Sequence, residues 1–185
     1  MIEKKLKIST GEEIFIYDNV FTSSESSHIQ NLIEGSYFKL GTRSYNSVNS
    51  NQTTFFQSKY NLDDVEKIGF KNNLNYMSIF NKHLKNYNRK INTWVNASTY
   101  LTDYRFHVDK TEVEGGLTQM YYANEKWDDN WGGETIFKNK NDEVEIAVSY
   151  KPNRIVIFDS HISHKPTNLS VKADMYRFIL VTQFE

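Results

Sequence analysis

The pattern of hydrophobic and polar positions separates an N-terminal part from the rest of the chain. An apolar, aromatic run at residues 14–21 predicts a strand, and the Ser/Thr-rich stretch after it predicts a capped helix that ends at Gly35. Residues 41–53 are polar without apolar periodicity and predict a long loop. An apolar stripe predicts a second helix over about residues 71–89. Residues 1–91 are therefore expected to form a strand and supporting helices.

Short β-branched and aromatic runs replace this pattern from residue 92 onward, and turn-forming residues separate them. Strands at such spacing predict a sandwich or barrel rather than a doubly wound sheet. We therefore expect a mainly β fold with N-terminal helices (α+β), a single domain over residues 1–185 whose β core spans residues 92–185. The predicted strands of the core cover residues 91–101, 103–109, 117–124, 133–139, 143–150, 153–160 and 176–184.

Composition and charge restrict the chemistry that the chain can carry. Lys and Arg total 22 against 23 Asp and Glu, so no bulk field favours a nucleic acid or an anionic membrane. Cysteine is absent, which excludes disulfides and thiolate chemistry and leaves His, Asp and Glu as the strong metal ligands. No apolar run is long enough to span a membrane and no signal-peptide segment is evident, so a soluble, cytoplasmic protein is expected.

The segment YRFHVDK, residues 104–110, carries a candidate metal-binding motif. On a strand, residues two apart face the same side, so His107 and Asp109 would project together. The later segment FDSHISHKP offers His161 and His164, either of which would complete a set of two histidines and one carboxylate. That set leaves three positions of an octahedral metal open, as in non-haem Fe(II) oxygenases. An H-x-D pair by itself is more often an ordinary hydrogen-bonded pair at a strand end.

Further segments follow this motif in a fixed order: YYAN at residues 121–124, WGGETIF at 131–137, NRIVIFDSHISH at 153–164 and YRFILVTQF at 176–184. In this order the chain resembles the 2-oxoglutarate/Fe(II)-dependent dioxygenases, specifically the prolyl 4-hydroxylase-like group, over about residues 94–185. The resemblance implies a double-stranded β-helix (jelly-roll, cupin-like) core that uses Fe(II), 2-oxoglutarate and O2, with ascorbate as an accessory. It also implies hydroxylation of a C–H bond, most readily in a prolyl residue of a peptide or protein, with decarboxylation of 2-oxoglutarate to succinate and CO2.

The resemblance assigns the metal ligands residue by residue. His107 and Asp109 match the family's first two ligands. His164 matches the third, because it lies between a hydrophobic strand that ends in Phe-Asp and a closely following proline, whereas His161 fits this pattern less well. The aspartate at position 109 favours hydroxylation over halogenation, because halogenating relatives carry a small residue there.

The resemblance also implies co-substrate contacts. Arg177, at the start of the last strand, matches the basic residue that binds the distal carboxylate of 2-oxoglutarate, a task that suits the planar arginine fork. Tyr122 and Tyr100, the latter seven residues before His107, are predicted as further contacts, although either could instead be a core aromatic. The match departs from the family where Arg177 lies three positions late and where Val181 replaces a hydroxyl residue, and both departures bear on co-substrate affinity.

The substrate and two other classes of function stay open at this point. A peptide or protein is the expected partner, and the polar loop 41–58 could close over an extended chain. A free amino acid or a small metabolite would use the same metal site. A non-catalytic β-barrel binding module would not need His107, and a cupin-type metal enzyme without 2-oxoglutarate would neither need Arg177 nor form succinate.

Other polar segments are expected to lie outside the site. His28 and His83 fall on predicted helices and should be solvent-facing or structural. Gly132 and Gly133 predict a tight turn into the strand ETIF. The basic cluster at residues 82–90 lies on a helix and its exit, which makes nucleic acid an unlikely partner, and the pattern does not predict an oligomeric state.

Overall fold

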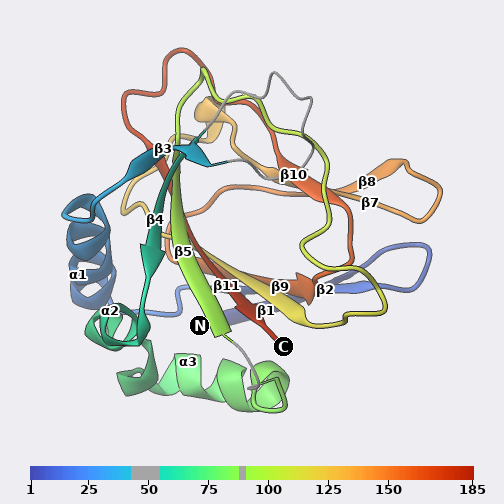
Figure 1. The fold of residues 1–185 in the computed structure, drawn as a ribbon, viewed down its shortest axis with the longest axis horizontal. Coiled ribbons are helices and arrows are strands. Elements are labelled where there is room, and N and C mark those ends of the chain that lie inside the picture. The colour runs from blue at the N-terminus through green and yellow to red at the C-terminus, as the bar shows by residue number, and fades with distance from the viewer. Residues whose placement is uncertain (43–54, 88–90) are drawn as a thin grey trace.

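The computed structural model describes residues 1–42, 55–87 and 91–185 of the chain. Within these residues, antiparallel strands form a larger sheet in the order β1-β2-β9-β6-β11-β5-β4-β3 and a smaller sheet in the order β10-β7-β8 (Figure 1). The strands are β1 Ile2–Lys7, β2 Glu13–Asp18, β3 Lys39–Thr42, β4 Phe55–Tyr60, β5 Ile91–Ser98, β6 Leu117–Tyr122, β7 Thr135–Lys138, β8 Val144–Val148, β9 Arg154–Asp159, β10 His164–Pro166 and β11 Arg177–Phe184.

The larger sheet is apolar on both faces, which explains the nearly continuous hydrophobic runs of its central strands. Along β11, Phe178 and Leu180 belong to a cluster shared with the helices, whereas Ile179 and Val181 belong to a cluster shared with the smaller sheet. This alternation follows from the two-residue period of a strand. The result is a mainly β, double-stranded β-helix core with helices packed on one side, as predicted from the sequence.

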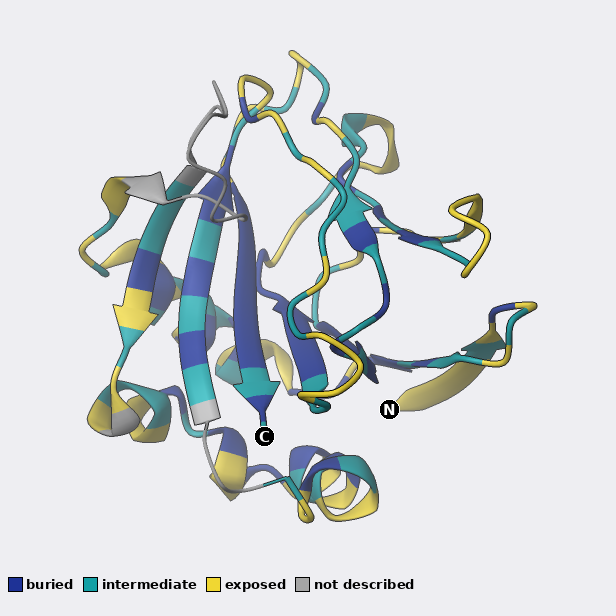
Figure 2. Ribbon diagram, turned by 45° about the vertical axis from the view of Figure 1, so that its right-hand side comes forward, coloured by how far each residue is buried: buried dark blue, intermediate teal, exposed yellow. Residues whose placement is uncertain are grey.

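The helices cover one face of the larger sheet, with their outer surfaces exposed (Figure 2). Helix α1 (Ser23–Glu34) begins with a reciprocal capping box between Thr22 and Glu25 and ends at Gly35, where the sequence predicts its end. The remaining helical elements are α2 Leu62–Ile68, the 3₁₀ turn η1 Phe70–Asn72, α3 Leu74–Ile79 and the π-helical turn η2 Phe80–Leu84.

The second helix predicted over about residues 71–89 is present but shorter, because α3 and η2 run together from Leu74 to Leu84. Gly69 adopts φ +77° and ends α2, and Asn73 has extended dihedral angles and caps the start of α3 through its side chain. Both residues interrupt helical geometry, because a left-handed glycine and an extended Asn cap each mark a helix boundary. A separate short helix, α2, and the turn η1 therefore precede the predicted helix, which begins only at Leu74.

Two further expectations change. The strand predicted over residues 103–109 does not form. This segment is irregular, and its one β-bridge joins His107 to His164. The charged segment 2–7 forms β1, an edge strand that the sequence pattern did not predict. Residues 43–54 of the predicted lid 41–58 lie outside the described residues, its residues 41–42 end β3, and its residues 55–58 belong to β4. Among the described residues, no helix has the length and apolarity needed to cross a membrane.

Candidate metal centre and adjoining cavity

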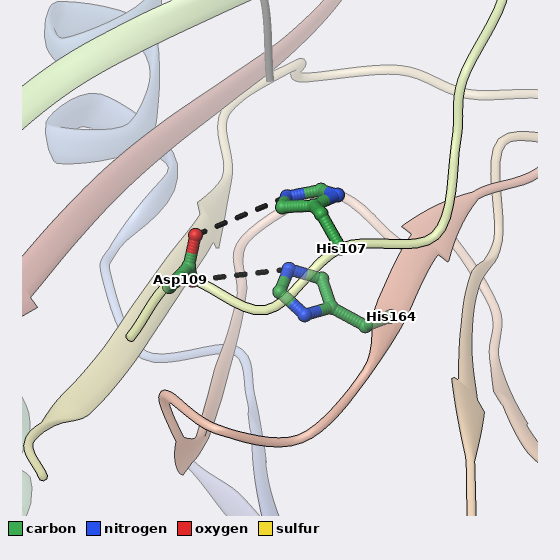
Figure 3. A group of neighbouring side chains, drawn as sticks. All are labelled: His107, Asp109 and His164. Carbon is green, nitrogen blue, oxygen red and sulfur yellow. Dashed lines mark ion pairs between the residues drawn. The ribbon is translucent and has the colours of Figure 1, made fainter. Parts of the chain in front are cut away.

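Three side chains from separate parts of the β core converge between the sheets (Figure 3). His107 and Asp109 come from the irregular segment between β5 and β6, and His164 begins β10. His107 Nε2 lies 3.9 Å from Asp109 Oδ1, and His164 Nε2 lies 3.8 Å from Asp109 Oδ2. Ligand atoms held about 2.1 Å from one ion lie about 3–4 Å apart, so this spacing suits a single metal ion.

Backbone carbonyl groups orient both histidine rings. His107 Nδ1 lies 3.0 Å from the carbonyl oxygen of Arg105, and His164 Nδ1 lies 2.9 Å from that of Ile162. A carbonyl oxygen can only accept, so each Nδ1 carries the proton and each Nε2 keeps its lone pair. Both lone pairs are therefore available on the side of Asp109, which is the arrangement that metal-binding histidines require.

The backbone brings the two histidines into register. His107 N donates to His164 O at 3.2 Å, and His164 N donates to His107 O at 3.0 Å. This reciprocal pair is an antiparallel β-bridge, in which directly opposite residues place their side chains next to one another. Asp109 N donates to Ser160 O at 2.9 Å, so the main chain fixes all three candidate ligands against the segment 160–164.

Hydroxyl groups hold the carboxylate of Asp109. Thr118 Oγ1 donates to Asp109 Oδ2 at 2.6 Å, and Ser160 Oγ lies 2.9 Å from Thr118 Oγ1. Since the threonine proton is committed to the carboxylate, the serine hydroxyl donates to the threonine. Burial lowers the pKa of His164 to about 4, against the opposing pull of the Asp109 carboxylate. His164 is thus neutral at neutral pH, the form that binds metal.

A cavity adjoins the three residues on the inner face of the larger sheet. Apolar side chains, among them Trp94, Met120, Ile179 and Val181, form much of its wall. Arg177 reaches the same cavity from the start of β11 and is 2% exposed. A buried guanidinium in an apolar wall is destabilising unless an anion or hydrogen-bond acceptors compensate for its lost hydration.

Arg177 has only part of that compensation from the described residues. Its Nε donates to the carbonyl oxygen of Gly133 at 3.0 Å, and its Cζ lies 5.0 Å from the ring centroid of Tyr150 and 5.7 Å from that of Tyr122. The Nη2 atom is buried without a hydrogen-bond partner, and the guanidinium forms no ion pair with a described residue. This unsatisfied donor fits a carboxylate ligand in the cavity.

The Gly132-Gly133 turn makes room for the arginine. Both glycines have positive φ, +73° and +83°, and they lead into β7 as the sequence predicts. A Cβ atom on Gly133 would lie 3.0 Å from Arg177 Cδ and 3.1 Å from its Nε. The glycine at this position therefore serves the backbone turn and the approach of Arg177 at once.

The structure changes the assignment of the tyrosines. Tyr100 is 46% exposed and does not line the cavity, so its prediction as a co-substrate contact is corrected: it lies in a surface turn after β5. Tyr104 lines the cavity instead, with a buried hydroxyl that has no partner among the described residues. Burial raises the pKa of Tyr104, although the charge of Arg177 opposes this, so the phenol remains a donor at neutral pH. Tyr122 is fully buried behind the wall and bonds Thr135 Oγ1 at 2.8 Å.

The other histidines lie apart from this group, as expected. His161 is not part of the converging set, whereas His164 is. His83 Nε2 lies 2.5 Å from the Tyr17 hydroxyl, and His28 Nε2 lies 3.1 Å from the carbonyl oxygen of Lys67. Both make structural contacts of their helices.

Sequence reasoning missed Tyr104, Thr118 and Ser160. A strand over residues 103–109 would have turned Tyr104 away from His107, because residues three apart in a strand face opposite sides. The irregular segment removes that restriction. Thr118 offered one signal, a hydroxyl residue within the apolar run of β6, but only the fold brings it to Asp109.

Comparisons with known proteins bear on the family and the fold of the chain. The family model described as 2OG-Fe(II) oxygenase superfamily matches residues 93–184, which include all three converging residues and Arg177. No curated protein matches the chain significantly.

Solved structures share the fold at low sequence identity. A Trichoplax adhaerens prolyl hydroxylase, in complex with a peptide fragment of the hypoxia inducible factor oxygen degradation domain, has a TM-score of 0.67 and 17% identity over 92% of this chain and 82% of its own. A Pseudomonas putida prolyl-4-hydroxylase has a TM-score of 0.64 and 11% identity over 93% and 91%. HygX from Streptomyces hygroscopicus, with nickel and 2-oxoglutarate bound, has a TM-score of 0.67 and 7% identity over 92% and 82%. With the family match, the chain belongs to the 2-oxoglutarate/Fe(II) oxygenase superfamily.

Proposed function

We propose that the protein is a dioxygenase that hydroxylates a prolyl residue in a peptide or protein substrate, with His107, Asp109 and His164 as the ligands of Fe(II). Arg177 binds the distal carboxylate of 2-oxoglutarate in this proposal. The observation that carries it is the buried, unsatisfied Nη2 of Arg177 in the same cavity as the three converging residues.

The donor set supports iron. Two imidazoles and one carboxylate on one side of an ion leave three positions open, as in non-haem Fe(II) oxygenases. Thr118 and Ser160 hold the carboxylate, while the Arg105 and Ile162 carbonyls hold the rings, so the ligands are oriented before metal arrives.

The cavity supports a dicarboxylate co-substrate. One carboxylate of such a molecule can lie beside the metal ligands while the other meets Arg177, whose charge has no described counter-ion. The Tyr104 hydroxyl offers a second donor to the same cavity. A charge-assisted hydrogen bond contributes about 1.5–3 kcal/mol, which is enough to decide how a small acid is oriented.

Each part then has a stated task. When bound, Fe(II) with 2-oxoglutarate would use O2 as the oxidant, with one oxygen atom entering the substrate C–H bond and the other entering succinate as CO2 is released. Trp94, Ile179 and Val181 form a dry wall that keeps water from the reacting groups. Asp109 occupies the carboxylate ligand position, which in this proposal leaves no room for a halide and favours hydroxylation.

Structural relatives support a prolyl substrate. Structural relatives include prolyl hydroxylases, and one of them is complexed with a peptide. A free amino acid or small metabolite is the alternative, because it would use the same metal site. Ascorbate and a cytoplasmic location stay predictions.

The test has a spectroscopic and a catalytic part. Under anaerobic conditions, Fe(II) and 2-oxoglutarate together should give a visible charge-transfer band in the wild type. His164→Ala should abolish the band, and Arg177→Met should shift it to concentrations of 2-oxoglutarate about tenfold to a hundredfold higher. Aerobic incubation with proline-containing peptides, followed by mass spectrometry, should show the gain of one oxygen atom on proline.

His161→Ala is the matched control, because it removes a nearby histidine that lies outside the converging group. It should leave the band unchanged. Absence of the band in folded wild type that binds Fe(II) would refute the role of 2-oxoglutarate and favour a cupin-type enzyme. A band without peptide turnover, accompanied by oxygen gain on a free amino acid, would refute the prolyl assignment alone.

A further inference from the structure

A second hollow lies on the opposite face of the larger sheet from the metal centre. This groove has a volume of about 540 Å³ and is formed by the start of β11, the end of β5, β4 and the segment around the end of α1. It shares its strand ends with the cavity, because Ala97 and Phe178 line the groove while their neighbours Asn96 and Arg177 line the cavity. We call it the aromatic groove.

Aromatic rings dominate its lining. The ring centroids of Phe56 and Tyr176 lie 6.2 Å apart in an edge-to-face arrangement, those of Tyr176 and Phe178 lie 6.1 Å apart, and those of Phe178 and Phe38 lie 6.0 Å apart. The four rings thus form a connected set from two strands, β4 and β11, and from the residues just before β11 and β3. Tyr176 is 46% exposed, so part of this aromatic surface is open to solvent.

The charges in the groove have one sign. Glu34 and Asp174 line it, both exposed, and no lysine, arginine or histidine does so among the residues that the structure describes. Neither carboxylate forms an ion pair within the described chain, although Glu34 accepts one hydrogen bond from Gln30 Nε2 at 2.7 Å. Elsewhere on the surface, carboxylates such as Glu13 and Asp142 do have lysine partners.

We propose that the aromatic groove anchors a lysine or arginine side chain of the peptide substrate. This inference rests on the proposed peptide hydroxylase function. Aromatic faces attract cations through their quadrupole, and carboxylates at the rim add charge complementarity. The same lining disfavours an acidic segment, because the carboxylates of Glu34 and Asp174 repel it. A purely apolar segment would leave both carboxylates without an oppositely charged partner. A groove on the outer face does not compete with the co-substrate for the cavity.

The alternation of β11 couples the groove to the site. Arg177 points into the cavity, and the next residue, Phe178, points into the groove. A peptide that passes over the ends of β5 and β11 can therefore hold its basic residue in the groove and present a nearby residue to the metal centre.

Binding of a matched pair of peptides to the metal-free full chain tests the proposal. The probes are fluorescein-labelled Gly-Lys-Pro-Gly-Lys-Pro-Gly and the same peptide with glutamine at each lysine, followed by fluorescence anisotropy. The wild type should bind the lysine peptide about tenfold more tightly than the glutamine peptide. The double variant Glu34→Gln/Asp174→Asn should reduce that ratio to about two or less, and Tyr176→Leu should reduce it about threefold.

Glu143→Gln is the matched control, because it removes an exposed charge from the β7–β8 turn, outside the groove lining. It should leave the ratio unchanged, whereas an equal loss in this variant would indicate unspecific attraction and overturn the proposal. An unchanged ratio in the double variant would also overturn it. If hydroxylation occurs with no preference between the peptides, the proposed function stands and the groove assignment fails. If neither peptide is hydroxylated while the binding preference holds, the prolyl substrate fails and the groove stands as a site for basic segments.

Discussion

Replacing Gly133 with alanine tests the role of Arg177 without removing a charge. The new Cβ would lie 2.9 Å from Leu169 Cδ2, 3.0 Å from Arg177 Cδ and 3.1 Å from Arg177 Nε. The leucine methyl group can rotate away, but the arginine is held there by its bond to the Gly133 carbonyl oxygen. The guanidinium must therefore shift, and weakening one of its hydrogen bonds should reduce 2-oxoglutarate affinity by about 1 kcal/mol, or about fivefold.

The same substitution also strains the backbone, because Gly133 has φ +83°. An L-residue in that region destabilises the fold by about 1–2 kcal/mol, which lowers Tm by about 2–8 °C in a chain of this size. Gly115→Ala provides the control: its φ is +65°, and an added Cβ meets nothing within 4 Å. Both variants should lose thermal stability, but only Gly133→Ala should lose co-substrate affinity.

The assay is anaerobic titration of Fe(II)-loaded protein with 2-oxoglutarate, at a temperature where both variants are fully folded. Thermal unfolding measured by circular dichroism reports the strain separately. Wild-type affinity for 2-oxoglutarate in Gly133→Ala would refute the reasoning that the Gly-Gly turn positions the arginine. If Gly133→Ala and Gly115→Ala lost 2-oxoglutarate affinity to a similar extent, the cause would be general destabilisation of the fold.

Three more predictions follow from the site. Thr118→Val should weaken Fe(II) binding about tenfold to a hundredfold, measured by anaerobic titration, because the Asp109 carboxylate loses its 2.6 Å donor; unchanged affinity would contradict this. Tyr104→Phe should raise the 2-oxoglutarate dissociation constant about fivefold while leaving urea stability equal or higher, because the removed hydroxyl is buried without a partner. Burial lowers the pKa of His164 from 6.5 in the unfolded chain to about 4 in the folded protein, so at acid pH the unfolded chain takes up a proton that the folded protein does not. The free energy of unfolding of the metal-free protein should therefore be unaffected above about pH 6.5 and lower by about 2–3 kcal/mol at about pH 4.5. Urea unfolding measures that loss, which should be absent in His164→Gln.

Local sequence signals predicted the elements whose pattern is set by neighbouring residues. The capping box of α1 and the apolar runs of β9 and β11 lie where periodicity and capping chemistry indicate. The second helix is shorter than predicted, because Asn73 has an extended backbone and caps the start of α3, and the helical turns end at Leu84. Edge strand β1 was not predicted, because both of its faces carry charged side chains and it pairs with β2 alone.

The candidate site divides in the same way. His107, Asp109, His164 and Arg177 could be named because the order of their segments resembles a family, although their roles remain proposals. Tyr104 could not be found, since its direction depends on an irregular backbone that no period describes. His164 rather than His161 lies beside His107 and Asp109 because of a backbone bridge, a contact between distant segments that local pattern does not encode.

The reciprocal bridge between His107 and His164 separates the energetics of folding from those of metal uptake. Main-chain hydrogen bonds bring the segments that carry His107 and His164 together when the β core folds. The entropy lost in closing the loop between them is therefore a part of folding and not of metal binding. An arriving ion then has to order little more than three side chains and remove their water. We therefore expect the apo protein to remain folded, its metal to exchange without unfolding, and ions of different size to compete on ligand preference rather than on their ability to assemble the site.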